Sequence, residues 1–403
     1  MLRPVSAEEA VSYVHSGDRV FVHAAALAAL SLVALVRFHG ALLSPRPLAD
    51  ELVYLEAFRA YAAGDSLYRP SPDGRGYYYP PTFARLGAAA LAAAGPDRLL
   101  AALRFANLIG LVAALWIALR LTTLAVPAAF ATGVIYLVLA PPALAHGFTS
   151  GNLSFAVVGS ILVALFAWPR QPVGGGALLG ASALVKPIAP VGLAVLALHR
   201  PAGGGRRHLV AGGLGLALFA AAMLTTAHLG EYLEAGRALG DWPLRRSLSL
   251  YRWLRIAGLP VTPLVVAAAV GAATVLWARR APRSPRMLAI AAIAGMTLAA
   301  PALWSHSLVL TLPLQAMAID LAVRRRSLAP GRSIRRSETA LVVLAALALH
   351  FADGIAGGLE TSPATAQLAG LGVPVFAPLA LALALFRHER TAAADLGRAP
   401  EAA

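Results

Sequence analysis

The sequence predicts an all-α, polytopic membrane protein with about 11–13 membrane helices, and three observations predict it. The 403 residues are 59% hydrophobic and only 13% charged, with a mean hydropathy of +0.70. Apolar runs of about 18 residues or more recur between positions 21 and 386, each able to cross a bilayer as a helix. Arginines cluster in the short intervals between these runs, as in cytoplasmic loops of membrane proteins.

The net charge of +15 does not indicate nucleic-acid binding, because the arginines sit between apolar spans, where they meet anionic lipid headgroups. The chain has no cysteine, which excludes disulfides, thiolate catalysis and thiolate metal sites. No histidine–carboxylate spacing indicates a metal site. The glycine runs 174–176 and 203–205 lack the strand and lysine of a phosphate-binding loop, so no nucleotide cofactor is expected.

The apolar spans divide the chain into four parts. We expect residues 1–20 to be a cytoplasmic tail, 21–325 a membrane module, 326–390 further membrane helices, and 391–403 a cytoplasmic tail. Two long polar segments of the module, 39–80 and 229–259, would lie together on the extracytoplasmic side. The heavy use of Ala, Gly and Arg suggests a bacterial protein, hence one of the inner (plasma) membrane with a cytoplasmic N-terminus.

The first polar segment follows a first span at 21–38. Residues 50–63 are expected to form an amphipathic helix at the membrane interface, ended by Gly64. Its apolar face would hold Leu52, Leu55, Phe58 and Arg59.

Proline at 80 and 81 suits the first turn of the next helix, which is too short for an ordinary span. The expected helices are then 82–94, 99–119, 125–140, 155–168, 209–228, 261–278, 288–300, 303–322, 340–356 and 368–386. Residues 146–152 are expected to be a turn.

The segment 174–199 is interrupted by Lys186-Pro187. Proline ends or kinks a helix and disfavours a helical backbone at the residue before it. We therefore expect two half-helices meeting at Lys186, and one long tilted helix is the alternative.

Lys186 is the single lysine among 34 basic residues. An ammonium group at membrane depth needs a polar or charged partner. The backbone groups left without hydrogen bonds at a helix break are stable within a membrane only where they line a cavity. This pattern favours a cation that binds a phosphate or pyrophosphate. The alternative is a lysine that extends to the membrane interface.

Asp50 follows the first span closely, where a carboxylate could take a proton from a hydroxyl as a general base. The alternative is a helix cap, for which aspartate is a preferred residue. Glu51 is a weaker candidate for the same role. Tyr77, Tyr78 and Tyr79 could form a platform for a sugar or lipid, or could anchor a helix at the interface.

His306 lies beside Trp304 between two expected helices and would share a membrane side with Asp50. It could bind a phosphate or a sugar hydroxyl. The alternative is a structural hydrogen bond, the commoner role of a lone histidine.

The order of these features resembles glycosyltransferase family 87, a family of GT-C membrane enzymes that use polyprenyl-phosphate-mannose. The resemblance covers roughly residues 20–325. It is carried by Asp50, Tyr54, Gly64 and Tyr68 of the first loop, the YPP of 79–81, Gly151-Asn152, Lys186-Pro187, and Trp304 with His306.

The resemblance implies a GT-C bundle that transfers a hexose, mannose first, from polyprenyl phosphate to a hydroxyl of a lipid or glycan acceptor. The reaction would be inverting and extracytoplasmic, with the donor, the acceptor and membrane lipids as partners. Asp50 would be the general base. Taken together, the residues and the resemblance give Lys186, His306, Glu51, Tyr54, Tyr78, Tyr79, Asn152 and Trp304 as the expected substrate-binding residues.

A transporter or flippase of lipid-linked sugars is the main alternative, because it too could use a lysine within the membrane to hold a phosphate. Transporters often contain paired repeats with broken helices in matching positions. The Lys186 break has no evident counterpart in the second half of the chain. A noncatalytic assembly protein would not require a carboxylate, a lysine and a histidine to converge.

Overall fold

The computed structural model describes residues 7–69, 76–120, 142–201, 205–237, 247–280, 284–300, 305–324 and 362–396, with parts of 133–137 and 344–359. All regular structure in these residues is helical, which confirms the all-α prediction. The expected helix at 125–140 and the loop at 301–304 lie largely or wholly outside the described residues.

Four described helices are long and apolar enough to cross a membrane. They are α1 (Ala7–Leu42, through its part Ala24–Leu42), α4 (Pro96–Arg120), α10 (Arg206–Leu224) and α19 (Ala364–Leu396). A fifth span is possible if α6 (Pro142–Ser150) and α7 (Ser154–Ala167), bent by 119°, are counted as one. Shorter apolar helices include α8 (Pro172–Val185), α14 (Pro263–Ala278) and α15 (Pro285–Ala299). The protein is therefore a multi-pass helical bundle, while the count of about 11–13 helices stays a prediction.

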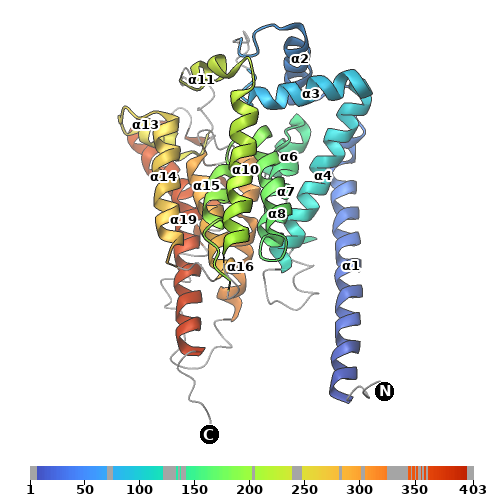
Figure 1. The fold of residues 1–403 in the computed structure, drawn as a ribbon, viewed down its shortest axis with the longest axis vertical. Helices are drawn as coiled ribbons and strands as arrows, with labels where there is room; N and C mark the ends of the chain where they lie inside the picture. Colours follow the sequence, from blue (N-terminus) through green and yellow to red (C-terminus); the bar gives the residue numbers. More distant parts are fainter. Residues whose placement is uncertain are drawn as a thin grey trace.

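The two polar segments come together at one end of the bundle. Figure 1 shows α2 (Ala49–Ala63), α3 (Pro81–Ala94), α11 (Leu229–Arg237) and α13 (Leu250–Ile256) at this end, with the start of α1 and the end of α19 at the other. Helix α3 runs across the bundle and not along it, consistent with its length. The expectation that 39–80 and 229–259 share one side agrees with this arrangement.

The boundaries expected for the two tails do not coincide with helix ends. Helix α1 is continuous from Ala7, so it includes most of the residues expected as an N-terminal tail. Helix α19 runs to Leu396 and includes the start of the expected C-terminal tail.

Glycines allow the central helices to approach backbone to backbone. A Cβ atom at Gly110 of α4 would lie 2.1 Å from the carbonyl oxygen of Phe155 in α7. A Cβ at Gly176 of α8 would lie 2.6 Å from the carbonyl oxygen of Ala211 in α10. Close contact through small residues is how helices associate where lipid removes the hydrophobic driving force.

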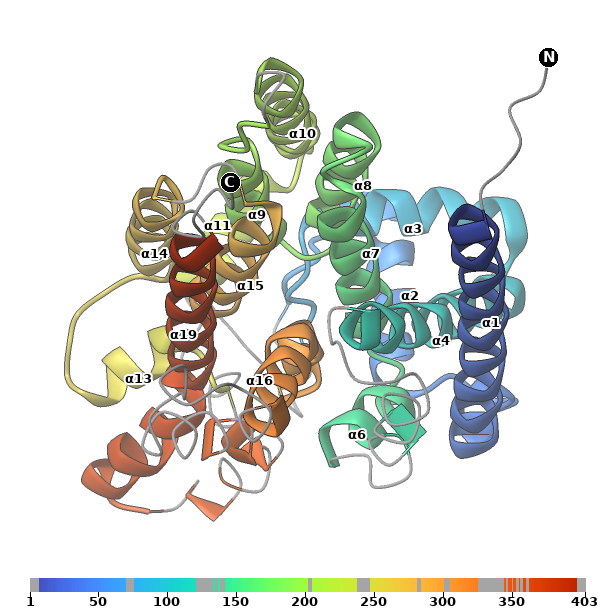
Figure 2. The same cartoon turned by 90° about the horizontal axis from the view of Figure 1, so that it is seen from below.

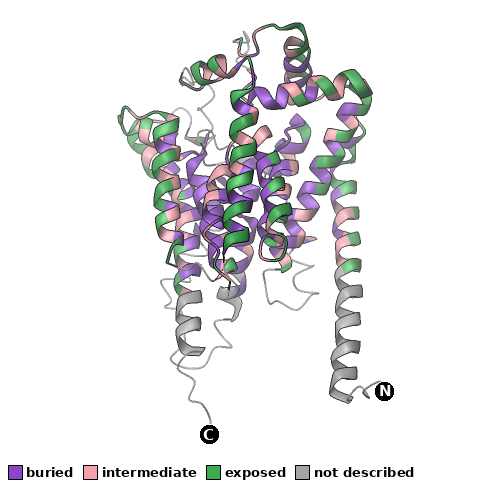
Figure 3. Ribbon diagram, viewed as in Figure 1, coloured by how far each residue is buried: buried purple, intermediate pink, exposed green. Residues whose placement is uncertain are grey.

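Seen along the bundle, α7 packs between α4 and α8, and α15 packs among α9 (Ala189–Leu196), α14 and α19 (Figure 2). The 3₁₀ helix η1 (Ser305–Thr311) contacts both α7 and α15 and leads into α16 (Leu312–Arg324). The buried residues gather between these helices, whereas much of the α10 ribbon is coloured as exposed (Figure 3). Its apolar residues Leu209 and Leu214 are among the exposed ones. Such a surface suits contact with lipid.

Two helices end at a glycine with a positive φ: α2, in the first polar segment, and α6, just before the turn that leads to α7. Gly64 has φ 76° and follows α2, with Asp65 N–H donating to Ala60 O at 2.9 Å, which confirms the expected end of this helix. Gly151 has φ 77° and follows α6 in the same way, with Asn152 N–H donating to Gly147 O at 3.0 Å. The prediction of a turn over 146–152 is thus wrong for its first part, because α6 continues to Ser150.

The buried face of α2 matches the predicted one only in part. Leu55 and Phe58 are buried as expected, whereas Leu52 is 46% exposed and Arg59 is also exposed. Tyr54, which is not part of the predicted face, is buried, and it packs edge-on against Phe83 of α3, as Phe58 does. The error arises because α3 packs along the i, i+4 stripe of the two aromatic residues, and propensity alone does not show which stripe a neighbour will cover.

The helix break at Lys186 is confirmed. Helix α8 ends at Val185, Lys186 is extended with φ −134° and ψ 118°, and α9 begins at Ala189, so the single tilted helix is excluded. The break leaves carbonyl groups without helical donors. The Thr82 hydroxyl, from the first turn of α3, donates to the Leu184 carbonyl oxygen at 2.7 Å.

Thr82 should therefore stabilise the broken helix. We expect Thr82→Val, which keeps the shape but removes the donor, to lower the free energy of unfolding by about 1–3 kcal/mol. Thr82→Ser retains a hydroxyl and is the matched control. Thermal unfolding of the purified protein in detergent measures both, and equal melting temperatures would contradict this role.

Candidate active site

Asp50 is held by the last residue of α6 and by the turn that follows it, and not by its own helix. It is the second residue of α2, is partly buried, and its Oδ2 accepts hydrogen bonds from Asn152 Nδ2 at 2.8 Å and Ser150 Oγ at 3.1 Å. The capping interpretation is wrong, because Leu48 occupies the N-cap position and Asp50 makes no capping bond. Among the described residues, Oδ1 has no hydrogen-bond donor, so this oxygen is available to a substrate hydroxyl.

Lys186 reaches the same turn from the break between α8 and α9. Its Nζ donates to Ser154 Oγ and, at 3.3 Å, to Asn152 Oδ1. The amine also lies 5.4 Å from the centre of the Tyr79 ring, in the range of a cation–π contact. These contacts argue against the alternative in which the side chain extends to the membrane interface.

Asn152 joins the carboxylate to the amine. Its Nδ2 donates to Asp50, while its Oδ1 accepts from Lys186 and from the backbone N–H of Ser154 at 3.0 Å. The side chain of Asn107 in α4 fixes the turn, because it donates to the Asn152 carbonyl oxygen and accepts from Ala156 N–H at 3.0 Å. Residues far apart in the sequence thus form one polar network.

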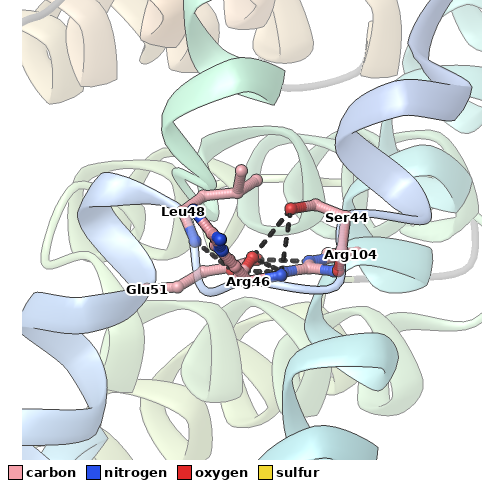
Figure 4. A network of polar contacts seen from close by, with 5 residues as sticks. All are labelled: Ser44, Arg46, Leu48, Glu51 and Arg104. Atoms are coloured by element: carbon pink, nitrogen blue, oxygen red, sulfur yellow. Dashed lines mark hydrogen bonds and ion pairs between the residues drawn. The ribbon is translucent and has the colours of Figure 1, made fainter.

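Glu51, beside the candidate base, is fully engaged within the protein (Figure 4). It is 1% exposed, and Arg104 donates to both of its carboxylate oxygens at 2.7 Å. Arg104 also donates to the carbonyl oxygens of Ser44 at 2.6 Å and Arg46 at 3.0 Å, and Leu48 N–H donates to Glu51 at 2.7 Å. This buried, bidentate pair fixes the loop that leads into the first turn of α2.

We expect Arg104→Met to lower the free energy of unfolding by about 3–5 kcal/mol, because it leaves the Glu51 carboxylate buried and without its partner. Arg98→Met, which changes an exposed arginine in the first turns of the same helix, is the control. Melting temperatures in detergent check the prediction. Similar values for the two variants would show that the pair contributes little.

Tyr54 and Tyr79 line the side of the network next to α3. Their hydroxyls are 2.7 Å apart, and Tyr54 also accepts from Leu153 N–H at 3.3 Å. Burial, with added contributions from neighbouring tyrosine and Asp50 groups, raises the pKa of Tyr54 well above its ordinary value. Burial and Asp50 likewise raise the pKa of Tyr79. Both hydroxyls therefore stay neutral and can donate hydrogen bonds.

The three consecutive tyrosines separate into different environments. Tyr77 is buried and donates to Pro80 O at 3.1 Å, and Tyr79 faces the network, while Tyr78 is 43% exposed. The carbonyl oxygen of Tyr79 accepts from the Tyr68 hydroxyl at 2.9 Å. Only part of the predicted platform therefore faces Lys186.

Of the remaining predicted site residues, Trp304 lies outside the described residues. His306 belongs to η1, but its side chain also lies outside them. The adjacent Ser307 is described, and its Oγ lies 3.3 Å from Ser154 Oγ, so η1 reaches the Lys186 end of the network.

Arg104, Asn107, Ser150 and Ser154 were not predicted. A signal for the first two was present, because an arginine and an asparagine one turn apart in an apolar helix require partners within the bundle. Ser150 and Ser154 flank the Gly151-Asn152 motif, and a serine alone gives no comparable signal.

The second polar segment is attached to the first. Glu231 of α11 accepts from Ser66 Oγ at 2.8 Å and Leu67 N–H at 3.3 Å, and its other oxygen lies 3.1 Å from His228 Nδ1. Burial acts to raise the pKa of Glu231, but these hydrogen bonds outweigh it and lower the pKa. The described parts of the two polar segments are thus joined at this end of the bundle.

Residues 77–305 match the model of glycosyltransferase family 87, which is more than half of the 403 residues. The chain belongs to glycosyltransferase family 87. The matched range of family 87 contains Tyr78, Tyr79, Asn152 and Lys186, whereas Asp50 precedes it. Asp50 is placed with these residues by the hydrogen bond from Asn152.

The structure is similar to the crystal structure of ArnT from Cupriavidus metallidurans in the apo state. The identity is 18% and the TM-score 0.38, over 93% of this chain and 78% of that one. The sequence matches no curated protein. As a member of family 87, the protein is a membrane glycosyltransferase with a polytopic helical bundle of GT-C type.

Proposed function

We propose that this enzyme transfers a hexose, mannose in the first instance, from polyprenyl phosphate to a hydroxyl of a lipid or glycan acceptor. The observation that supports this proposal most is the network in which Asn152 joins Asp50 to Lys186. A carboxylate with a free oxygen and a cation lie within one site. These are the groups needed to deprotonate an acceptor and to stabilise a departing phosphate.

In the proposed step, the free oxygen of Asp50 accepts the proton of the acceptor hydroxyl. The acceptor oxygen forms a bond to the anomeric carbon, and the bond from that carbon to the phosphate oxygen breaks. The electron pair leaves with the polyprenyl phosphate. A single displacement inverts the anomeric centre, and Lys186 stabilises the phosphate because its ammonium group is positive.

The other site residues divide into three groups in this proposal. Tyr79, next to Lys186, and Tyr54 line the donor side, and His306, Trp304 and the exposed Tyr78 extend the substrate-binding surface. Glu51, a predicted substrate-binding residue, accepts from Arg104 with both carboxylate oxygens, and we assign it the role of holding the loop before Asp50.

We place the site on the extracytoplasmic side of the inner (plasma) membrane, with the N-terminus in the cytoplasm. Helix α10 begins with Arg206-Arg207 and α14 is followed by Arg279-Arg280. Figure 1 places these two helix ends away from α2 and α11. Arginine-rich ends favour the cytoplasm, which puts α2 and the site on the other side.

The test uses the purified full-length protein in lipid nanodiscs with radiolabelled polyprenyl-phosphate-mannose and candidate lipid and glycan acceptors. We expect label to move to an acceptor with inversion at the anomeric carbon. Movement of intact donor across a vesicle membrane without cleavage would instead favour a flippase. Absence of transfer from several polyprenyl-phosphate hexoses would overturn the proposed donor class.

A further inference from the structure

We propose that Asn152 is a positioning residue that holds Asp50 and Lys186 in one site while preventing them from forming a direct ion pair. This inference rests on the proposed function, because it assigns the two groups separate tasks in transfer. A carboxylate that accepts directly from an ammonium group is a weaker base, and the ammonium group then has less charge to offer a phosphate.

The polarity of the asparagine side chain matches this role. An ionised carboxylate can only accept hydrogen bonds, and an ammonium group can only donate them. Asn152 presents its amide N–H to Asp50 Oδ2 at 2.8 Å and its carbonyl oxygen to Lys186 Nζ at 3.3 Å. A neutral group that donates on one side and accepts on the other satisfies both charges without joining them.

The surroundings of Asn152 fix the direction of this amide. Its Oδ1 also accepts from the N–H of Ser154 at 3.0 Å and from Ser154 Oγ at 2.7 Å. A flipped amide would place its NH₂ against these donors and its oxygen against the Asp50 carboxylate. Asn152 is 8% exposed, so water cannot readily replace the lost bonds.

The arrangement leaves capacity on each reacting group. Lys186 can donate three hydrogen bonds, and within the described part of the chain Asn152 and Ser154 accept two of them, which leaves one for a donor phosphate. Asp50 uses Oδ2 for Asn152 and Ser150, and its Oδ1 remains for an acceptor hydroxyl. Asn152 therefore orients each group without using all of its hydrogen-bonding capacity.

The first test compares Asn152→Asp with Asn152→Ala. Aspartate has the size of asparagine, so a space-filling role predicts that Asn152→Asp is the milder change. The bridging role predicts the opposite for kcat, because aspartate places an acceptor against Asp50 and an anion beside Lys186. We expect kcat to fall by about 100-fold or more in Asn152→Asp, a loss of the size seen when a preorganised donor is removed.

The second test measures binding of polyprenyl phosphate, which needs no turnover. In Asn152→Ala we expect Lys186 to pair with Asp50, so that the Kd rises about tenfold, equivalent to about 1.4 kcal/mol. In the double variant Asp50→Asn/Asn152→Ala the competing carboxylate is gone, and the Kd should return toward the wild-type value. A merely structural asparagine would not be rescued by a second substitution.

Thr149→Ala, an exposed change in the last turn of α6, is the matched control and should leave kcat and Kd unchanged. A kcat for Asn152→Asp above that of Asn152→Ala, or no rescue in the double variant, overturns the inference. Inactivity of the wild-type enzyme with every polyprenyl-phosphate hexose would instead count against the proposed function, and the binding test would still decide the role of Asn152.

Discussion

Asp50→Asn is expected to abolish sugar transfer while leaving a folded protein that still binds the lipid donor. The substitution keeps the size of the side chain and removes its negative charge and its ability to take a proton. Loss of a general base typically lowers the rate by about 10²–10⁴-fold. Because donor binding is assigned to Lys186 and its neighbours, the Kd for polyprenyl phosphate should change little.

The measurement is kcat with saturating donor and acceptor, together with donor Kd and melting temperature in the same nanodiscs. Asp65→Asn is the matched control, since Asp65 is an acidic residue of the same segment with an exposed side chain. It should retain wild-type turnover. Full transfer by Asp50→Asn would remove Asp50 from the mechanism, and a large fall in melting temperature would indicate a structural role.

The features that the sequence predicts well are those set by local chemistry. The break at Lys186-Pro187 follows from the missing proline N–H, and the end of α2 follows from the freedom of Gly64 to adopt a positive φ. The existence of the helix predicted at 50–63 follows from its sequence pattern, although its buried face does so only in part, and the grouping of the two polar segments agrees with their charge.

The features that the sequence does not predict depend on partners distant in the chain. Glu51 is expected to bind substrate, but Arg104, 53 positions later, engages both of its oxygens. The sequence allows Asp50 to be a helix cap. The structure shows that Asn152, 102 positions later, donates a hydrogen bond to its carboxylate. Single-sequence patterns show which residues are unusual in a membrane, and the tertiary structure decides what each one contacts.

Lys186→Met is expected to raise the Kd for the polyprenyl-phosphate donor by about 10–100-fold, with a much smaller effect on acceptor KM. Methionine retains much of the length and apolar character of the lysine stem, so the change mainly removes the charge and three hydrogen-bond donors. Ser154 and Asn152 would lose a partner, but both keep hydrogen bonds to each other. The protein should therefore fold.

Two variants separate charge from position in this experiment. Lys186→Arg keeps the positive charge, but the planar guanidinium of arginine does not reproduce the compact ammonium held between Ser154 and Asn152, so donor binding should recover only in part. Arg59→Met removes an exposed cation from α2 and should leave both constants unchanged. Equal losses for donor and acceptor in Lys186→Met would contradict a phosphate-binding role. They would indicate that the lysine acts by maintaining the turn that also holds Asp50.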